Sequence, residues 1–430
     1  MNNFRIILTA IFAAFIVIGI IMFSLFRGGA GRGALEQITV WGTVPESTFI
    51  KYMEAVNANN KTSISVKYIE KESDSFDSEF IEALARGEGP DAILLPQDQI
   101  LRHKDKIYPI PYSSLSERNF KDTFIEEGEL YLSSAGIVAL PLIIDPLVMY
   151  WNRDIFTDAI LSEPPVYWDE FFSLASKITR VDGSLNIERS AISFGEFVNV
   201  LNAKEILSLL ILQAGSPIVK IDKDKPVSVL SDNSGFNIPP SEAALRFYTE
   251  FSNPSKKSYS WNRSLPLSRQ YFLSGDLAVY FGFASELNDI KIKNPNLNFD
   301  AAVIPQRRDG KTKITFGKIQ GLALVKSSRK LSSAFSAISA LASKDNISLW
   351  SKISGLPPVR RDMLTAGAAD PVKSIFYSSA VISKGWLDPD REETKAIFQN
   401  MVESITSGKL RLGEAVTRAD SEIQNLLSPK

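Results

Sequence analysis

The sequence contains no cysteine and only one histidine, His103. Without cysteine the chain cannot form disulfides, thiolate zinc sites or thiol nucleophiles, and a lone histidine excludes paired-histidine metal sites. Charge of neither sign dominates, because 48 basic residues oppose 49 acidic residues and give a net charge of −1. This balance provides no indication of a nucleic-acid partner. Since His103 lies among charged residues, we expect it to be a solvated surface side chain.

The sequence also lacks the short motifs that identify common catalytic and cofactor sites. It contains no Gly-x-Ser-x-Gly nucleophile motif, no phosphate-binding loop and no cluster of metal ligands. Residues 28–34, GGAGRGA, include a Gly-x-Gly-x-x-Ala pattern, but they follow a long apolar run and precede another strand, so we interpret them as a linker. We therefore predict no cofactor, no metal and no catalytic residues. Two acidic residues that meet across a cleft, as in glycoside hydrolases, are compatible with the sequence.

One long apolar run, from Ile6 to Phe26, contains no charged residue. Its length is about the 20 residues that a membrane-spanning helix needs, and it exceeds the apolar core of a cleavable signal peptide. We expect an uncleaved N-terminal membrane helix, with export after signal cleavage as the alternative. Residues 1–35 are thus predicted to be anchor and linker.

The length of the remaining chain suits two globular lobes, each able to bury its own core. Between residues 38 and 95, patterns typical of strands alternate with patterns typical of helices. The expected strands are residues 38–42, 63–69 and 92–95. Strand, helix, strand, helix, strand predicts a parallel α/β sheet.

Residues 139–156, ALPLIIDPLVMYWNRDIF, hold two apolar runs that Asp145-Pro146 separates. The runs predict two buried strands, and the Asp-Pro dipeptide between them predicts a hinge. A carboxylate at a strand end lies where α/β proteins bind their ligands. Since an unpaired buried carboxylate is costly, Asp145 either binds ligand or pairs locally.

The same segment resembles the first interlobe crossing of extracellular solute-binding proteins, the receptor subunits of ABC importers in the maltose-binding class. The matching residues are Leu140-Pro141, Asp145, Leu147, Tyr150-Trp151-Asn152, Asp154 and Phe156. Similar words follow in the order of the family, among them ITVWG at 38, PDAILLP at 90, FLSGDLAVYFG at 272, NFDAAVIPQ at 298, GLPPVRRDM at 355 and SGKLRLGEAV at 407. Their joint order makes the resemblance specific, and it spans nearly everything after residue 36. The chain departs from many members in lacking an N-terminal cysteine for lipid attachment.

The resemblance implies an α/β fold of two lobes, of the periplasmic-binding-protein type II class, that closes on a ligand by hinge motion. The first lobe would comprise residues 36–144 and 306–356, and the second residues 145–305 and 357–430. The implied function is a monomeric receptor outside the cytoplasm that captures a carbohydrate for an ABC permease. A cell-surface glycoside-acting enzyme and a ligand sensor with the same fold are the alternatives.

Candidate ligand-binding residues come from strand ends and from the positions that the resemblance places in the cleft. A sugar needs polar groups for its hydroxyls and flat aromatic rings for its faces. The candidates are Trp41, Gln97, Asp145, Trp261, Gly282, Phe283, Gln320 and Trp386. For each of them, packing, local pairing or a plain turn is the alternative role. We assign Trp168 and Trp350 to packing.

Overall fold

The computed structural model describes residues 36–59, 64–184, 186–233 and 235–428. The predicted membrane helix, within residues 1–35, lies outside these ranges. Among the described residues, no helix is both long and apolar enough to span a bilayer.

The first lobe begins with the predicted alternation of strands and helices. The order is β1 (Ile38–Gly42), α2 (Glu46–Asn59), β2 (Val66–Glu70), α3 (Phe76–Arg86) and β3 (Ala92–Pro96). β1 pairs in parallel with both β2 and β3. α2 buries Phe49, Tyr52, Met53 and Val56, which recur at helical spacing and face the sheet. The predicted parallel α/β arrangement is confirmed.

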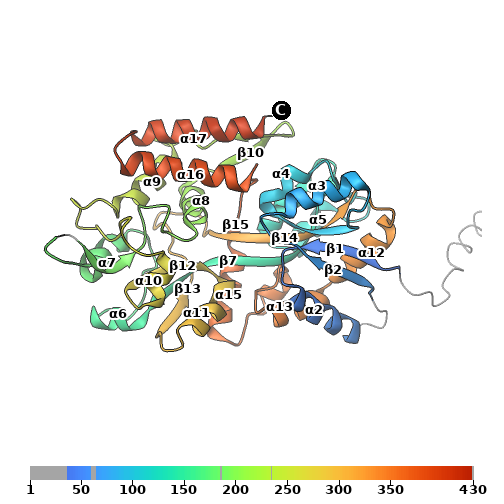
Figure 1. Cartoon of the computed structure of the whole chain (residues 1–430), viewed down its shortest axis with the longest axis horizontal. Helices are drawn as coiled ribbons and strands as arrows, with labels where there is room; N and C mark the ends of the chain where they lie inside the picture. Colours follow the sequence, from blue (N-terminus) through green and yellow to red (C-terminus); the bar gives the residue numbers. More distant parts are fainter. Residues whose placement is uncertain (1–35, 60–63, 185, 234, 429–430) are drawn as a thin grey trace, which may run out of the picture.

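Strand β7 (Leu140–Asn152) joins the two halves of the molecule. Its first half pairs antiparallel with β14 (Thr315–Val325), and its second half pairs with β12 (Leu277–Phe283) and β13 (Phe299–Ala302). The predicted break into two strands is therefore wrong, because β7 continues through Asp145-Pro146. The strand changes partners at this dipeptide, where a proline without an N–H is tolerated. Figure 1 shows β7 and β14 running side by side across the middle of the molecule.

The sheet runs without interruption in the order β2-β1-β3-β14-β7-β12-β9-β8, where β8 is Arg180–Val181 and β9 is Ile187–Ile192. Two separate hydrophobic cores lie along it. The first contains β1 to β3, the first half of β7 and helices α12 (Leu331–Leu341) and α13 (Lys344–Ser354). The second contains the rest of β7, α7 (Glu170–Ile178), α8 (Ala203–Ala214) and α9 (Pro240–Glu250). Two cores on one sheet constitute a two-lobed α/β fold.

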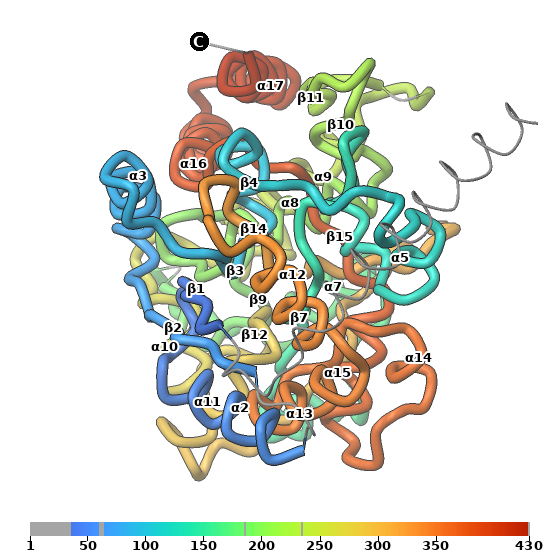
Figure 2. The backbone as a smooth tube through the Cα atoms, turned by 90° about the vertical axis from the view of Figure 1, so that its right-hand side faces the viewer, coloured from blue at the N-terminus to red at the C-terminus, as the bar shows by residue number. Residues whose placement is uncertain are grey.

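The C-terminal helices α16 (Arg391–Thr406) and α17 (Leu412–Leu427) belong to the second core. They lie side by side over α8 and α9 in Figure 1. Figure 2 shows the N-terminal end of α16 close to α3 of the first lobe. α16 therefore lies where residues of the second lobe can meet residues of the first.

The remaining elements are short or lie at the periphery. In the first lobe they are the 3-10 turn η1 (Gln97–Gln99), α4 (Ile100–His103), β4 (Ile107–Tyr108), α5 (Glu117–Thr123), η2 (Glu126–Tyr131), β5 (Leu132–Ser133) and β6 (Gly136–Ile137). Elsewhere they are α6 (Arg153–Asp158), β10 (Val219–Asp222), β11 (Lys225–Ser228), α10 (Ser268–Leu273), η3 (Ala284–Glu286), α11 (Leu287–Lys293), α14 (Arg361–Leu364), α15 (Pro371–Val381) and β15 (Ser383–Lys384).

The prediction of a solvated His103 is wrong. Its side chain is fully buried, with Nε2 2.8 Å from Oδ1 of Asp77 and the ring against the edge of Phe80. The charged neighbours of His103 were misleading because a short helix turns successive side chains to different faces. Trp168 and Trp350, by contrast, are buried packing residues as predicted.

Candidate ligand-binding site between the lobes

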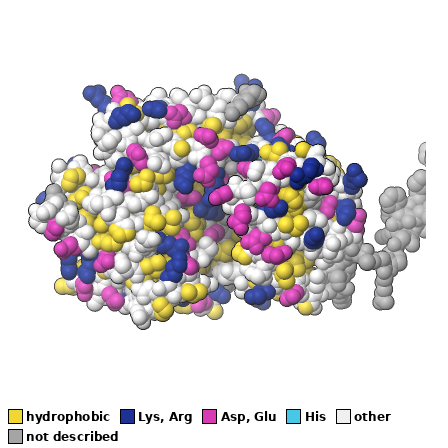
Figure 3. Space-filling view, viewed as in Figure 1, with side chains coloured by type: hydrophobic (Ala, Val, Ile, Leu, Met, Phe, Trp, Pro, Cys, Tyr) yellow, Lys and Arg dark blue, Asp and Glu magenta, His cyan; other side chains and the backbone are white. Residues whose placement is uncertain are grey.

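A cavity of about 470 Å³ lies where the two lobes meet. The first lobe contributes the end of β3 and the turn η1, and the second lobe contributes the N-terminal end of α8 with the loop before it. β14 and the segment that leads into α16 complete the wall. The charged lining residues are Asp98, Lys204, Glu205, Lys318, Asp388, Arg391 and Lys395. In Figure 3, basic and acidic side chains border the junction between the halves.

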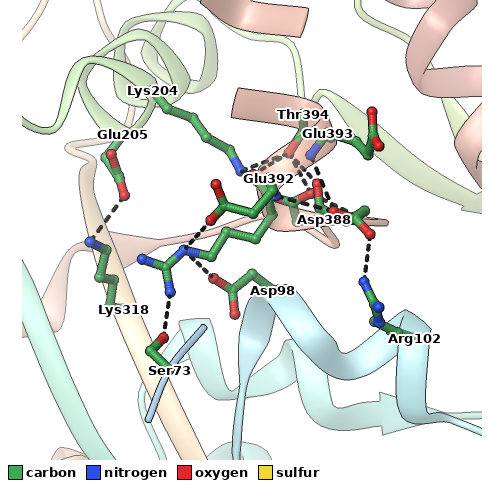
Figure 4. Close-up of polar contacts among 12 residues, drawn as sticks. Ser73, Asp98, Arg102, Lys204, Glu205, Lys318, Asp388, Glu392, Glu393 and Thr394 are labelled. Atoms are coloured by element: carbon green, nitrogen blue, oxygen red, sulfur yellow. Dashed lines mark hydrogen bonds and ion pairs between the residues drawn. The ribbon is translucent and has the colours of Figure 1, made fainter. Parts of the chain in front are cut away.

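Basic and acidic side chains in this cavity form pairs. Lys204 Nζ lies 2.5 Å from Oδ2 of Asp388 and 2.7 Å from Oγ1 of Thr394. Lys318 Nζ lies 3.0 Å from Oε1 of Glu205. Figure 4 shows that these contacts connect α8, β14 and the segment before α16. The pairing leaves a wall that is nearly neutral yet rich in donors and acceptors of hydrogen bonds.

Asp98 is the acidic group that the first lobe places on the cavity wall. It follows β3 directly, in η1, and its Oδ2 lies 3.9 Å from Nε of Arg391. Burial raises the pKa of Asp98, and the positive charge of Arg391 opposes this rise. A carboxylate held near a cation in this way can accept hydrogen bonds from ligand hydroxyls.

Helix α8 begins at the cavity with its first residues, Ala203, Lys204 and Glu205, on the wall. Asn202 precedes the helix in a left-handed conformation, which asparagine tolerates better than most residues. The first N–H groups of a helix have no partner within it. That of Ala203 donates to Val200 O at 3.3 Å, so Lys204 provides the N–H of this end that can donate to a ligand oxygen. The apolar remainder of α8 is buried in the second core and holds this end in place.

The structure places three of the predicted site residues on the cavity wall: Gln97, Gln320 and Trp386. The Gln97 amide holds β14, since Nε2 donates to Gly317 O and Oε1 accepts from the N–H of Ile319. Gln320 Oε1 is buried and has no hydrogen-bond partner among the described residues.

Trp386 forms part of the wall but is only 3% exposed. Its Nε1 donates to Oγ of Ser208 at 3.2 Å, and its ring stacks on Phe398. Lys204 Nζ lies 5.7 Å from the centre of the ring. The indole therefore offers the cavity a firmly held edge rather than an open face.

Two of the other predicted residues are tryptophans that lie outside the cavity lining. Trp41 is the penultimate residue of β1. It packs against Phe80, and Lys71 Nζ lies 4.1 Å from the centre of its ring. Trp261 is fully buried in the second core, where its Nε1 donates to Oδ1 of Asn199. Their ligand role stays a prediction.

Asp145, Gly282 and Phe283 also lie outside the cavity lining. Asp145 pairs locally, accepting a 3.0 Å hydrogen bond from the N–H of Ser285, and burial raises the pKa of Asp145 to about 6. A Cβ at Gly282 would lie 2.5 Å from the Tyr280 ring, so packing alone explains this glycine. Phe283 is buried beneath Lys318 Nζ, which lies 3.9 Å from the ring centre.

The sequence reasoning missed most of the charged residues of the cavity. Asp98 belongs to the turn Pro96-Gln97-Asp98, which the sequence does indicate as a possible ligand contact after the third strand. Asp388 comes two residues after Trp386, so proximity to that candidate could have found it. Lys204 and Glu205 lie in the first turn of an otherwise apolar helix, directly after Asn202-Ala203. Arg391 and Lys318 have no local signal, because they meet the others only through the fold.

A second cavity, of about 590 Å³, lies within the second lobe. Its walls are mainly apolar and include Trp168, Phe172, Phe236 and Phe247. Such walls match hydroxyl groups poorly, because each hydroxyl loses its water without gaining a partner. The interlobe cavity is therefore the better candidate for a polar ligand.

Residues 51–374 match the family of bacterial extracellular solute-binding proteins, and this match covers well over half of the chain. The chain belongs to that family. The relatives of this solute-binding protein include binding proteins of Brucella abortus and Brucella suis. Each is 25% identical to it over 340 residues, which cover 72% of this chain and 74% of the relative.

Solved structures with the fold of this solute-binding protein cover nearly its whole length. A cyclo/maltodextrin-binding protein in complex with maltotetraose has a TM-score of 0.73 at 17% identity, covering 92% of this chain and 98% of its own. The cyclic α-maltosyl-1,6-maltose-binding protein of Arthrobacter globiformis has a TM-score of 0.74 at 14% identity, covering 92% and 99%. A sugar-binding protein of Xanthomonas citri has a TM-score of 0.72 at 18% identity, covering 91% and 97%. The predicted two-lobed, maltose-binding-like fold is confirmed.

Proposed function

We propose that this solute-binding protein captures a neutral oligosaccharide between its lobes and delivers it to an ABC permease. The observation on which this rests is the interlobe cavity, in which Lys204, Glu205, Lys318 and Asp388 form internal ion pairs. A charged ligand bound to any of these four groups would have to displace the partner of that group. A neutral ligand with many hydroxyls can instead bind to the remaining donor and acceptor sites.

The similar structures support a carbohydrate as the ligand class. The ligands in these structures include maltotetraose, mannotriose and α-D-tagatose, so one fold holds sugars of different lengths. A cavity of about 470 Å³ is within the usual range of small-molecule sites. For this chain we propose ligand contacts from Asp98, Gln97, Gln320, Trp386 and the N-terminal end of α8.

An enzyme that cleaves glycosides needs two carboxyl groups in different protonation states across the sugar. In the cavity, Glu205 and Asp388 are bound to lysines, and Asp98 lies near Arg391. The ion pairs of Glu205 and Asp388 with lysines engage both carboxylates and in this way favour a receptor over a hydrolase. We also propose that residues 6–26 anchor a monomeric receptor outside the cytoplasm. We further propose that the two lobes, divided near residues 144 and 306, close by a hinge motion at Asp145-Pro146.

The proposal is tested by thermal-shift screening and titration calorimetry against glucose, maltose, maltotetraose and mannotriose, with product analysis of each mixture. We expect stoichiometric binding of at least one oligosaccharide without product. Release of shorter sugars would instead identify a glycoside-acting enzyme. Absence of binding across the sugars would refute the carbohydrate assignment.

The same titration with Asp98→Asn locates the ligand. Loss of a charged hydrogen-bond acceptor costs about 1.5–3 kcal/mol, so we expect affinity to fall about tenfold or more. Asp105→Asn is the matched control, because Asp105 is an exposed carboxylate of the same lobe that pairs with the adjacent Lys106. Equal affinities of the two variants would remove Asp98 from the site.

A further inference from the structure

Two arginines span the gap between the lobes at one end of the cavity, in opposite directions. Arg102, in α4 of the first lobe, donates from Nη1 to Oδ2 of Asp390 at 2.6 Å. Arg391, at the start of α16, reaches back with Nη1 3.2 Å from Oγ of Ser73 and Nε 3.9 Å from Oδ2 of Asp98. Figure 4 shows Ser73, Asp98 and Arg102 on one side of these contacts and Lys204, Asp388 and Thr394 on the other.

Each member of the Arg102–Asp390 pair is held in place within its own lobe. Arg102 Nε lies 3.0 Å from Oδ2 of Asp77, whose other oxygen binds the buried His103. Asp390 caps α16, because its Oδ1 accepts from the N–H groups of Glu392 and Glu393. Little side-chain freedom is left to lose when the pair forms, which is the condition under which a partly exposed ion pair contributes measurably.

The Arg102–Asp390 pair lies outside the cavity lining, whereas Asp98 and Arg391 belong to it. α16 packs on the second lobe through Phe398 and Met401, so the pair joins the first lobe to the second. A change at Arg102 or Asp390 therefore acts on ligand binding through the separation of the lobes, not through lost contacts to ligand.

We propose that Arg102 and Asp390 form a clasp that holds the lobes of the ligand-free protein together and thereby sets its fraction of closed molecules. The inference rests on the proposed function, in which both lobes contact the ligand. A ligand that binds the closed state gains apparent affinity in proportion to the population of that state. With side chains 40% and 26% exposed, the pair is expected to change the closed-to-open ratio by about two- to fivefold.

The test needs no ligand. Because the sequence contains no cysteine, two introduced cysteines can be labelled selectively. Ala85→Cys in α3 and Ala396→Cys in α16 change exposed alanines on opposite lobes, and spin labels there report the interlobe distance by electron–electron resonance. In this background we expect Arg102→Gln and Asp390→Asn each to shift the distribution toward longer distances. Asparagine retains the helix cap while removing the charge. The double variant should open no further than either single variant, because both remove the same pair.

Arg118→Gln is the matched control, since Arg118 pairs only within the first lobe, with Asp122, and its side chain is 92% exposed. Raising NaCl to about 0.5 M should lengthen the distances more in the parent protein than in the clasp variants, which keep only the longer contact of Arg391 with Asp98. Identical distributions for the parent, Arg102→Gln and Asp390→Asn would overturn the clasp. Because no sugar is present, that result would leave the proposed receptor function standing.

Discussion

Glu127 is a buried carboxyl that sequence reasoning did not single out. Both of its oxygens are buried and lack a hydrogen-bond partner among the described residues. They lie against two backbone positions without side chains: a Cβ at Gly317 would overlap the carboxyl, and one at Gly385 would lie 2.9 Å from Oε1. Burial raises the pKa of Glu127 well above its ordinary value, because the charged form loses its hydration without gaining a partner.

This raised pKa gives the stability of the protein a pH dependence of defined sign. Above the ordinary glutamate pKa of about 4.3, the unfolded chain releases the proton of Glu127 while the folded chain retains it. The contribution of Glu127 to stability therefore falls as pH rises from about 4 toward the folded-state pKa. Glu127→Gln removes this loss, so its stability relative to the parent should increase steadily as pH rises.

The measurement is the free energy of unfolding by denaturant titration at pH 4.5, 6 and 8. Glu54→Gln, in the exposed face of α2, is the control and should follow the parent at each pH. A difference between Glu127→Gln and the parent that stays constant from pH 4.5 to 8 would contradict a protonated Glu127.

For single residues, the sequence indicated a turn of the cavity wall better than it indicated the charged groups that pair there. The turn after β3 was expected to meet ligand, and Gln97 and Asp98 do line the cavity. Trp261, chosen for its resemblance to a cleft position, is instead buried in the second core. The ion pairs Lys204–Asp388 and Lys318–Glu205 join residues far apart in the chain, so no local pattern could have indicated them.

Among the elements, the antiparallel pair of β7 and β14 is the link on which the proposed closure depends. Both strands pass from one core to the other, and they pair from Gly317 to Leu322. Gly317 lies opposite Pro146, at the point where β7 changes partners. Its missing side chain leaves the room that the Glu127 carboxyl and Ile144 occupy.

Gly317→Ala should therefore destabilise the protein by about 1–3 kcal/mol, the usual cost of overpacking a filled interior. Gly183→Ala is the matched control, because a Cβ at Gly183 would meet nothing within 4 Å. Thermal unfolding of both variants provides the comparison. An unfolding temperature for Gly317→Ala equal to that of Gly183→Ala would show that the structure around Gly317 accommodates a methyl group without strain.

The elements of the first lobe followed from periodicity, since β1, α2, β2, α3 and β3 each show a clear apolar pattern. The continuity of β7 did not, because Asp-Pro ordinarily interrupts a strand. Where a strand changes partners at a proline, the sheet needs no backbone hydrogen bond donated by that proline. The change of partners is visible only in the tertiary structure. The same limit applies to His103, whose burial against Phe80 depends on a neighbouring helix.

For the whole molecule, the order of weak motifs predicted the two-lobed fold correctly, and the family match supports the same assignment. The interface between the lobes was beyond sequence reasoning. The contacts across this interface join residues as distant in the chain as Ser73 and Arg391. Closure on a ligand is thus a property of the assembled fold and must be tested on it.

The most direct test of a ligand held between the lobes is hydrogen–deuterium exchange with and without a saturating amount of the sugar that binds most tightly. We expect simultaneous protection of residues 97–99 in the first lobe and 202–205 in the second, because one ligand contacts both. Protection confined to one lobe, or centred on the apolar cavity near Phe236 and Phe247, would contradict it.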